Sequence, residues 1–440
     1  MDWRILTTGT DDAAIAALLD RRRLLPGDAG DQLSGQVRAV IDRVRADGDA
    51  ALVAFTRDFD RVALARERLR VPAAEIRAGT AQAEPALREA IGRAADNIRR
   101  FHERQRRQDL LQMDPDGGFL AYRYLPMARI GAYVPGGAAG ATPLISSVLM
   151  NVIPAQIAGV SSIAVCSPPR SDGSLAPGLL CALDCLGVDE VYRIGGAQAI
   201  AALAYGTESI APVDKVVGPG NKYVTEAKRQ VFGRVGLDML AGPSEVAIIA
   251  DETADPRCVA ADLLAQAEHD TCAGAILLTP GRALAAAVTR EIDAALAGLS
   301  RASTARASLA THGGAVITRD LEEALMLSEQ LAPEHLELIV AEPLALAARV
   351  RKAGAVFIGP YSPEALGDYV AGTNHVLPTN GTARFTSGLG VDDFLRRLSL
   401  VSYSRRGFAA DGPFAVRLAE EEGLTAHALS LLRRLEGEGA

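Results

Sequence analysis

The sequence of 440 residues carries a net charge of −8 with acidic and basic side chains interspersed, which argues against a nucleic-acid partner because such partners favour a basic face. Hydrophobic residues make up 49% of the chain and charged residues 23%, so a sizeable globular core can form. The longest apolar stretches contain Ser, Asn, Gln and Pro, and none of them is a clean membrane span. This composition suits an enzyme that acts on small molecules.

The N-terminus and the cysteines indicate the compartment. The first residues, MDWRILTTGTDDA, lack both the basic and the apolar region of a signal peptide. The five cysteines include no CxxC pair, and their odd number argues against a disulfide framework. We therefore expect a cytoplasmic protein whose cysteines stay reduced.

Roughly the first 110 residues are predicted to be helical, because apolar residues recur there at three- and four-residue spacing. The clearest segments are residues 12–23, 33–60 and 85–107, the last with a long polar face. These helices are candidates for a packing or dimerisation layer.

From about Arg129 onward, short apolar runs rich in β-branched residues alternate with helical segments. A first series comprises RIGAYV, SSIAVCSPP, EVYRIGG and DKVVGPG, and a second comprises EVAIIA, GAILLTP, GAVITR, LELIVA and GAVFIG. Strand–helix alternation is typical of parallel sheets covered on both faces. The sequence therefore predicts two related α/β halves, followed by two helices in the tail from Pro413.

Three glycine turns follow predicted strands of the first series, although no GxGxxG fingerprint is present. They are YVPGGAAG, RIGGAQA and VVGPGNKY, and the side chains of interest beside them are Tyr133, Gln198 and Asn221. Ligands bind at the carboxyl ends of strands in open α/β sheets, where backbone N–H groups favour phosphate. Any one loop alone is more simply a tight turn, but three in one half favour a nucleotide site.

The stretch LLAQAEHD (residues 263–270) brings an amide and an imidazole together. Asp255 can cap the preceding helix, and Pro256 suits its first position. Gln266 and His269 are three residues apart and share a helix face, which offers two ligands to a metal. A helix end with polar residues in water remains the alternative, and Asp262 lies on nearly the same face.

The other histidines occur in distinct contexts. Glu334 and His335 stand in LAPEHLEL, where a carboxylate beside an imidazole can tune a base, although an exposed turn explains the pair about as well. The remaining acid–histidine contexts are the turn-rich loop with Asp368 and His375 and the tail with Glu422 and His427. We expect His102 to be a solvated helix residue and His312 a turn residue.

With these segments together, the chain resembles the histidinol dehydrogenase family, zinc- and NAD-dependent enzymes that complete histidine biosynthesis. The resemblance covers roughly residues 32–427 in the family's order and is carried by YVPGG, SSVLMN, GGAQAIAALAYGT, VDKVVGPGN, VTEAKRQVFG, DMLAGPSEV, DLLAQAEHD, APEHLEL, GDYVAGTNHVLPT, SGLGVDDFL and EEGLTAH. Unbroken matches of this length are far more specific than one short motif.

The resemblance implies a four-electron oxidation, in which L-histidinol, water and two NAD⁺ give L-histidine and two NADH by way of an aldehyde. It assigns one zinc ion per subunit to Gln266, His269, Asp368 and His427, and the acid–base pair to Glu334 and His335. It assigns NAD contacts to Tyr133, Gln198 and Asn221, and substrate contacts to Ser244, Glu422, His335 and the zinc ligands. Glu422 and His427 would come from the neighbouring subunit, so a homodimer is implied.

The resemblance also implies an α/β fold of two Rossmann-like parallel-sheet halves, similar to aldehyde dehydrogenases, with helical N- and C-terminal dimerisation segments. The expected division has an N-terminal helical segment (1–28), a first α/β domain with most zinc ligands (29–126 and 239–380), a second α/β domain on the NAD side (127–238) and a C-terminal helical segment (381–440). One departure is a glycine loop at residues 136–147 that is a few residues longer than usual. It concerns the first nucleotide loop and not the metal ligands.

Four other functions remain open on the sequence. An aldehyde dehydrogenase with a covalent intermediate needs an activated cysteine, but most cysteines are expected to be buried packing residues. A zinc hydrolase is disfavoured because HExxH is absent. A non-catalytic binding protein would not need the acid–base pair and the metal ligands together. A relative that oxidises another polar alcohol is opposed only by Glu422, a partner for the substrate amine.

Overall fold

The computed structural model describes residues 3–24, 31–136 and 143–436. Its contacts divide the chain into two compact units. The first unit combines Met1–Gln105 with Met127–Phe394, and the second combines Arg106–Pro126 with Leu395–Ala440. No helix of the described chain is both long enough and apolar enough to cross a membrane.

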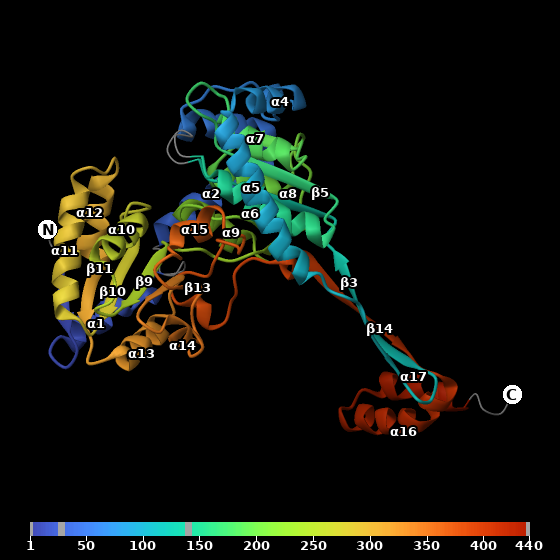
Figure 1. Cartoon of the computed structure of the whole chain (residues 1–440). Coiled ribbons are helices and arrows are strands. Elements are labelled where there is room, and N and C mark those ends of the chain that lie inside the picture. Colours follow the sequence, from blue (N-terminus) through green and yellow to red (C-terminus); the bar gives the residue numbers. More distant parts are fainter. Residues whose placement is uncertain (1–2, 25–30, 137–142, 437–440) are drawn as a thin grey trace. The chain divides into compact units, whose positions relative to one another are not determined.

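One half of the first unit is built on a six-stranded sheet whose strand pairs are all parallel (Figure 1). Its order is β1 (Ile5–Thr7), β11 (Gly313–Ile317), β10 (Gly274–Thr279), β9 (Glu245–Ala250), β12 (His335–Ile339) and β13 (Ala355–Ile358). The helices of this half are α1 (Asp12–Leu19), α10 (Pro256–Ala267), α11 (Arg282–Leu296), α12 (Ala302–His312), α13 (Leu321–Leu331), α14 (Pro343–Ala347) and α15 (Glu364–Tyr369).

Both faces of this sheet are covered, because successive strand residues point to opposite sides. In β9, Val246 and Ile248 join the core beneath α10, α11 and α12, whereas Ala247 and Ile249 join the core beneath α1 and α13. Figure 1 shows α11 and α12 in yellow on one side of the sheet and α13 in orange on the other. This two-sided burial explains why the strands are nearly continuous apolar runs.

The other half carries a five-stranded parallel sheet in the order β6 (Val191–Arg193), β5 (Ser162–Ser167), β4 (Arg129–Tyr133), β7 (Lys215–Val217) and β8 (Gly236–Leu237). Its longer helices are α2 (Asp31–Asp47), α3 (Asp49–Phe55), α4 (Ala73–Gln82), α5 (Pro85–His102), α6 (Ile145–Ala158), α7 (Pro177–Cys185), α8 (Gly196–Tyr205) and α9 (Lys222–Val231). The predicted pair of parallel α/β halves is confirmed.

The early helices pack on the five-stranded half. Helix α2 contacts α8 and α9, α4 contacts α7, and α5 contacts α6 and α7. This packing differs from the expected grouping of residues 29–126 with 239–380. The N-terminal segment also differs from the expected helices alone, because β1 forms the edge of the six-stranded sheet beside β11. A three-residue edge strand is too short to leave a clear period in the sequence.

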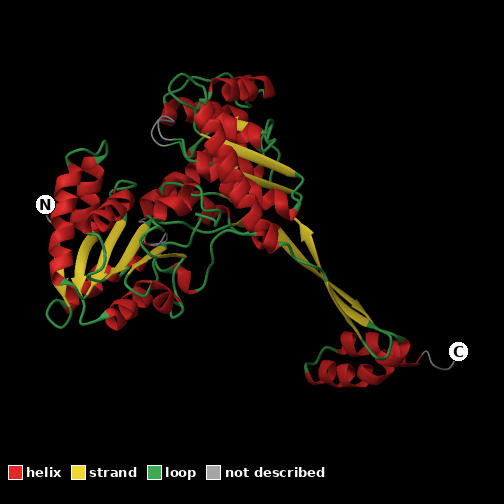
Figure 2. Cartoon of the chain, viewed as in Figure 1, coloured by secondary structure: helices red, strands yellow, loops and turns green. Residues whose placement is uncertain are grey.

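The second unit is an antiparallel sheet with a helical pair, in which Figure 2 shows long strands in yellow and helices in red. The strands β14 (Leu395–Ser402), β3 (Phe119–Pro126) and β2 (Leu110–Met113) pair in that order, and α16 (Arg405–Glu421) packs on α17 (Thr425–Glu436). The two expected tail helices are present, and the segment 381–440, expected to be a helical dimerisation segment, also contains β14. Every residue of β2 is exposed, so no buried face marks that strand in the sequence.

Short helices complete the described chain. They are η1 (Arg21–Leu24), η2 (Thr56–Asp60), η3 (Arg66–Arg68), η4 (Glu103–Gln105), η6 (Thr382–Arg384) and η7 (Val391–Phe394).

Candidate active site

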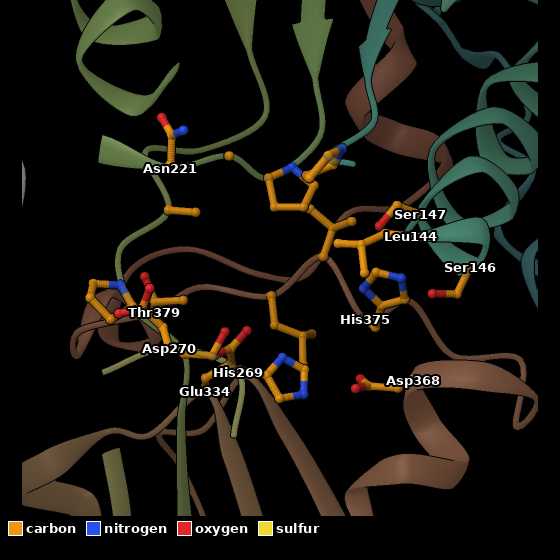
Figure 3. Close-up of a pocket in the computed structure, with 18 of the residues that line it drawn as sticks. Leu144, Ser146, Ser147, Asn221, His269, Asp270, Glu334, Asp368, His375 and Thr379 are labelled. Carbon is orange, nitrogen blue, oxygen red and sulfur yellow. The ribbon is translucent and has the colours of Figure 1, made fainter. Parts of the chain in front are cut away.

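A cavity of about 1340 Å³ lies within the first unit and is lined by residues of both α/β halves. Its lining includes the loop before α9, the start of α6, the loop after α10, the residues just before and at the start of β12, and α15. Figure 3 shows side chains from these separate elements around one space, with Asn221 and Ser147 from one half and Asp368 and Glu334 from the other. Parallel strands of both sheets therefore deliver polar residues to a single site.

Helix α10 begins as the sequence predicts. The Asp255 carboxylate accepts the backbone N–H of Arg257 at 2.9 Å, and Pro256 occupies the first turn. Near the other end, Gln266 is fully buried, and neither of its amide atoms has a hydrogen-bond partner among the described residues. An amide left unpaired in a protein interior is costly, so this side chain fits a group that the chain itself does not supply.

The predicted ligands His269 and Asp368 lie together. One ligand atom each of His269, Glu364 and Asp368 fall within 4.8 Å of one another, and all three residues line the cavity. His269 follows α10, while Glu364 and Asp368 project from α15 one turn apart. The sequence interpretation did not include Glu364, although its four-residue spacing from Asp368 places both carboxylates on one helix face.

The electrostatics of this cluster favour a cation. Burial raises the pKa of Asp368 to about 7. Burial, followed by the nearby carboxylates of Asp368 and Glu334, raises the pKa of Glu364 well above its ordinary value. Desolvated acids that repel one another gain most from a bound positive charge. The donor set of imidazole nitrogen and carboxylate oxygen therefore fits a zinc ion with open positions. Gln266, the other predicted ligand of this half, does not line the cavity.

Glu334 and His335 lie just before and at the start of β12, and both line the cavity. Glu245 contacts both of them through its backbone. Its N–H donates to Oε2 of Glu334 at 3.1 Å, and its carbonyl oxygen lies 3.2 Å from Nδ1 of His335. Because that carbonyl can only accept, Nδ1 carries the proton, and Nε2 is left as an acceptor without a partner among the described residues.

The ionisation of this pair follows from its burial. Burial lowers the pKa of His335 to about 3, so the imidazole is neutral at physiological pH. Burial, and then the charge of Glu245, raises the pKa of Glu334 well above its ordinary value. A neutral imidazole with one free nitrogen beside a carboxyl group of raised pKa is an arrangement suited to proton transfer. The exposed-turn alternative for the pair is therefore wrong.

The nucleotide-loop candidates lie at different depths. Asn221 lines the cavity and caps α9, where its side chain accepts the N–H groups of Tyr223 and Val224. Tyr133 and Gln198 are buried and do not line the cavity. The Tyr133 hydroxyl accepts the N–H of Gly196 at 3.1 Å. Of the longer glycine loop, residues 137–142 lie outside the described residues.

The remaining predicted site residues divide between the units. Ser244 lines the cavity and hydrogen-bonds to Glu334. Glu422 directly follows α16 and His427 lies on α17, so both belong to the second unit, where they are exposed. Asp262 hydrogen-bonds to Glu337 instead of extending the Gln266–His269 pair.

Several histidine and cysteine expectations need correction. His102 is fully buried, with Nδ1 2.9 Å from the carbonyl oxygen of Ile98, because it lies on the inner face of α5. His312 ends α12 instead of standing in a turn. His375, which received no role, lines the cavity, and burial lowers its pKa to about 4. Most cysteines were expected to be buried, but only Cys166 and Cys181 are. Cys185 and Cys258 are exposed, and Cys272 is half-buried and lines the cavity.

Comparisons with known proteins agree with the fold. A family sequence model described as histidinol dehydrogenase matches residues 26–435. The histidinol dehydrogenase of Rhodospirillum rubrum is 51% identical over 437 residues, covering 99% of each chain. That of Geobacillus kaustophilus is 52% identical over 404 residues, covering 91% of this chain and 94% of the relative. A crystal structure of histidinol dehydrogenase from Elizabethkingia anophelis has a TM-score of 0.92 at 36% identity, covering 100% of this chain and 99% of that one.

The two parallel sheets and a cavity holding imidazole and carboxylate donors define an α/β enzyme with a candidate metal centre. The chain belongs to the histidinol dehydrogenase family, as the sequence resemblance predicts. It is accordingly an NAD-dependent oxidoreductase that acts on a small molecule.

Proposed function

We propose that the protein oxidises L-histidinol to L-histidine with water and two NAD⁺, through an aldehyde, as the last step of histidine biosynthesis. The observation that carries this proposal is the shared cavity. The proton-transfer pair Glu334 and His335 lines the same space as His269, Glu364 and Asp368. An alcohol held by the metal-binding cluster would therefore lie within reach of a base.

Gln266, His269 and Asp368 would hold a zinc ion, with His427 of the partner subunit as the fourth ligand. The unpaired amide of Gln266 and the clustered ligand atoms of His269 and Asp368 support this assignment. Zinc has no redox chemistry of its own and could not accept the electrons. Bound there, it would instead polarise the substrate oxygen and bind the imidazole and amine of histidinol. Ser244, His335 and the partner subunit's Glu422 would contact the substrate as well.

His335 would act as the base in both half-reactions. Nε2 would take the hydroxyl proton of the alcohol while Nδ1–H stays on the carbonyl oxygen of Glu245. NAD⁺, when bound, accepts the hydride from the carbon that bears this hydroxyl group. In the second half-reaction Glu334 would take a proton from the water that adds to the aldehyde, and His335 would take the hydroxyl proton of the resulting hydrate. The first half-reaction thus releases one hydride and one proton. The second, which adds water, releases one hydride and two protons and gives the carboxylate.

The cavity has room for the cofactor beside the substrate. Its volume of about 1340 Å³ exceeds the roughly 300–1000 Å³ of common small-molecule pockets. Asn221 stands at the N-terminus of α9, where backbone N–H groups favour phosphate. We assign NAD contacts to Asn221 at the lining and to Tyr133 and Gln198 behind it. The buried Oε1 of Gln198, which has no partner among the described atoms, supports its assignment.

A cytoplasmic homodimer with an active site shared between subunits completes the proposal. The second unit supports dimerisation because it exposes large apolar side chains that a monomer would leave in water. They include Leu110, Leu111, Met113, Val401, Phe414 and Leu418.

The test is an assay of the purified protein with L-histidinol and NAD⁺, with and without a chelator. We expect two NADH per histidinol, loss of turnover on chelation and recovery when Zn²⁺ is added. The same assay with other polar amino alcohols measures substrate preference. Absence of NADH formation with the zinc-loaded protein would contradict the proposal and favour a binding protein.

A further inference from the structure

Glu245 is a common support for both proton-transfer residues. It is the first residue of β9. Its backbone N–H donates to the Glu334 carboxylate at 3.1 Å, and its backbone carbonyl oxygen accepts from Nδ1 of His335 at 3.2 Å. Strand β9 lies beside β12, with His335 opposite Val246. The orientation of both functional side chains therefore depends on where β9 begins.

The side chain of Glu245 is itself held by a buried cation. Nε of Arg21 lies 3.1 Å from Oε2 of Glu245, and the two side chains are 2% and 0% exposed. Arg21 comes from η1, far away in the sequence. Its Nη2 also donates to the carbonyl oxygen of Cys272 at 2.8 Å, in the cavity-lining loop that follows His269. One guanidinium thus joins the start of β9 to the loop after α10.

The site is shaped for this guanidinium. A Cβ added to Gly274 would lie 3.1 Å from Cζ of Arg21, so the absence of a side chain there gives Arg21 its space. Around Glu245, the other charged neighbours are Glu334, which repels it, and Arg384, which attracts it without a close contact. Backbone N–H groups of Asn380 and Gly381 also hydrogen-bond to Glu245. Among the residues that the structure describes, Arg21 is therefore the cation in direct contact with this buried acid.

We propose that Arg21 is a positioning residue for the reaction, because its ion pair with Glu245 fixes the peptide groups that orient Glu334 and His335. The inference rests on the proposed roles of those two residues. Removing one partner of a buried ion pair leaves an uncompensated charge, and the segment that carries it must shift or take up a proton. Displacement of a reacting group by about 1 Å costs a large factor in rate.

The test compares Arg21→Met, Arg21→Lys and the control Arg22→Met in the zinc-loaded, full-length protein. Arg22 is the exposed neighbour in the same short helix. For Arg21→Met we expect kcat to fall about 10- to 100-fold, with KM for NAD⁺ and zinc content unchanged. Arg21→Lys keeps the charge and should recover part of the lost kcat, while Arg22→Met should have the kcat of the wild type. A merely structural role would lower the melting temperature without this split between kcat and KM.

Unchanged kcat in Arg21→Met would overturn the inference, and so would a loss of kcat that follows loss of zinc. Crystal structures of wild type and Arg21→Lys give a readout that does not need activity. The inference expects the contacts of the Glu245 peptide with Glu334 and His335 in both, and an Arg21→Met structure that keeps both contacts would also overturn it. If wild type fails to oxidise histidinol, the proposed function alone falls, because the structural comparison still decides the role of Arg21.

Discussion

Burial decides the chemistry of individual residues in the cavity. His335 has a pKa lowered to about 3, and its Nδ1–H donates to a backbone carbonyl oxygen, so the other nitrogen, Nε2, is available as a base at neutral pH. His102 is a useful comparison, because it is also buried with Nδ1 near a carbonyl oxygen but does not line the active-site cavity.

Replacing His335 by Asn is therefore expected to lower kcat about 10²- to 10⁴-fold, the usual contribution of a positioned base. Zinc content and NAD⁺ affinity should stay at wild-type levels, since neither is assigned to this side chain. Steady-state kinetics and metal analysis provide the measurement. His102→Asn is the matched control and should change stability without a comparable change in kcat. Near-normal turnover of His335→Asn would remove this residue from the mechanism.

The site residues that the sequence predicts are those in distinctive motifs, whereas residues whose role depends on tertiary contacts were missed. Gln266, His269 and Asp368 stand in such motifs, and the last two lie in one cluster. Glu364 was missed although its spacing from Asp368 was readable. The contacts of Glu245 with Arg21 and Glu334 could not be predicted from sequence. The first joins side chains 224 positions apart, and the second joins a backbone N–H to a side chain 89 positions away.

At the scale of elements, the glycine turn after β7 shows why backbone freedom matters near the proposed cofactor site. Gly218 has φ +106°, and a Cβ there would lie 2.1 Å from the backbone oxygen of Tyr133. The atom that this Cβ would meet belongs to the backbone and not to a flexible side chain, so any substitution must move the loop that carries Asn221. Gly233 also has a positive φ, +90°, but a Cβ there would meet nothing within 4 Å.

We expect Gly218→Ala to raise KM for NAD⁺ and to destabilise the fold by about 1–3 kcal/mol, the range for backbone strain. Gly233→Ala carries a similar dihedral penalty without the clash, so it should lose some stability and keep the wild-type KM. Thermal unfolding and NAD⁺ titration of both variants separate the two effects. Equal KM values for the two variants would argue against a role of the loop in cofactor binding.

Sequence patterns predicted most strands of both parallel sheets because most of them are buried on both faces and contain continuous apolar runs. The strands that these patterns did not predict are β1 and β8, which are only three and two residues long and are not buried. The antiparallel strands gave no such signal. All of β2 is exposed, and β3 and β14 are at most half-buried. An alternating pattern requires one face in a core, and this sheet has none in the described chain of its own unit.

At the scale of the whole molecule, the proposed site is completed by the partner subunit's His427 and Glu422. This arrangement predicts complementation between two inactive variants. A mixture of His335→Asn and His427→Asn subunits, refolded or coexpressed, should regain about a quarter of wild-type activity, since half of the dimers are hybrids with one intact site. Each variant alone serves as the control. Absence of recovery in a mixture with verified hybrids would mean that all ligands come from one chain.

The second unit joins Arg106–Pro126 to Leu395–Ala440, and β3 pairs with β14 along its full length. During translation, β3 is synthesised before residues 127–394, whose synthesis takes on the order of tens of seconds. Throughout that interval the β2–β3 hairpin has an open edge, a known route to wrong pairing between nascent chains. The last segment synthesised therefore closes the earliest exposed strand, and a ribosome that stalls before residue 395 releases a chain whose hairpin is free to aggregate.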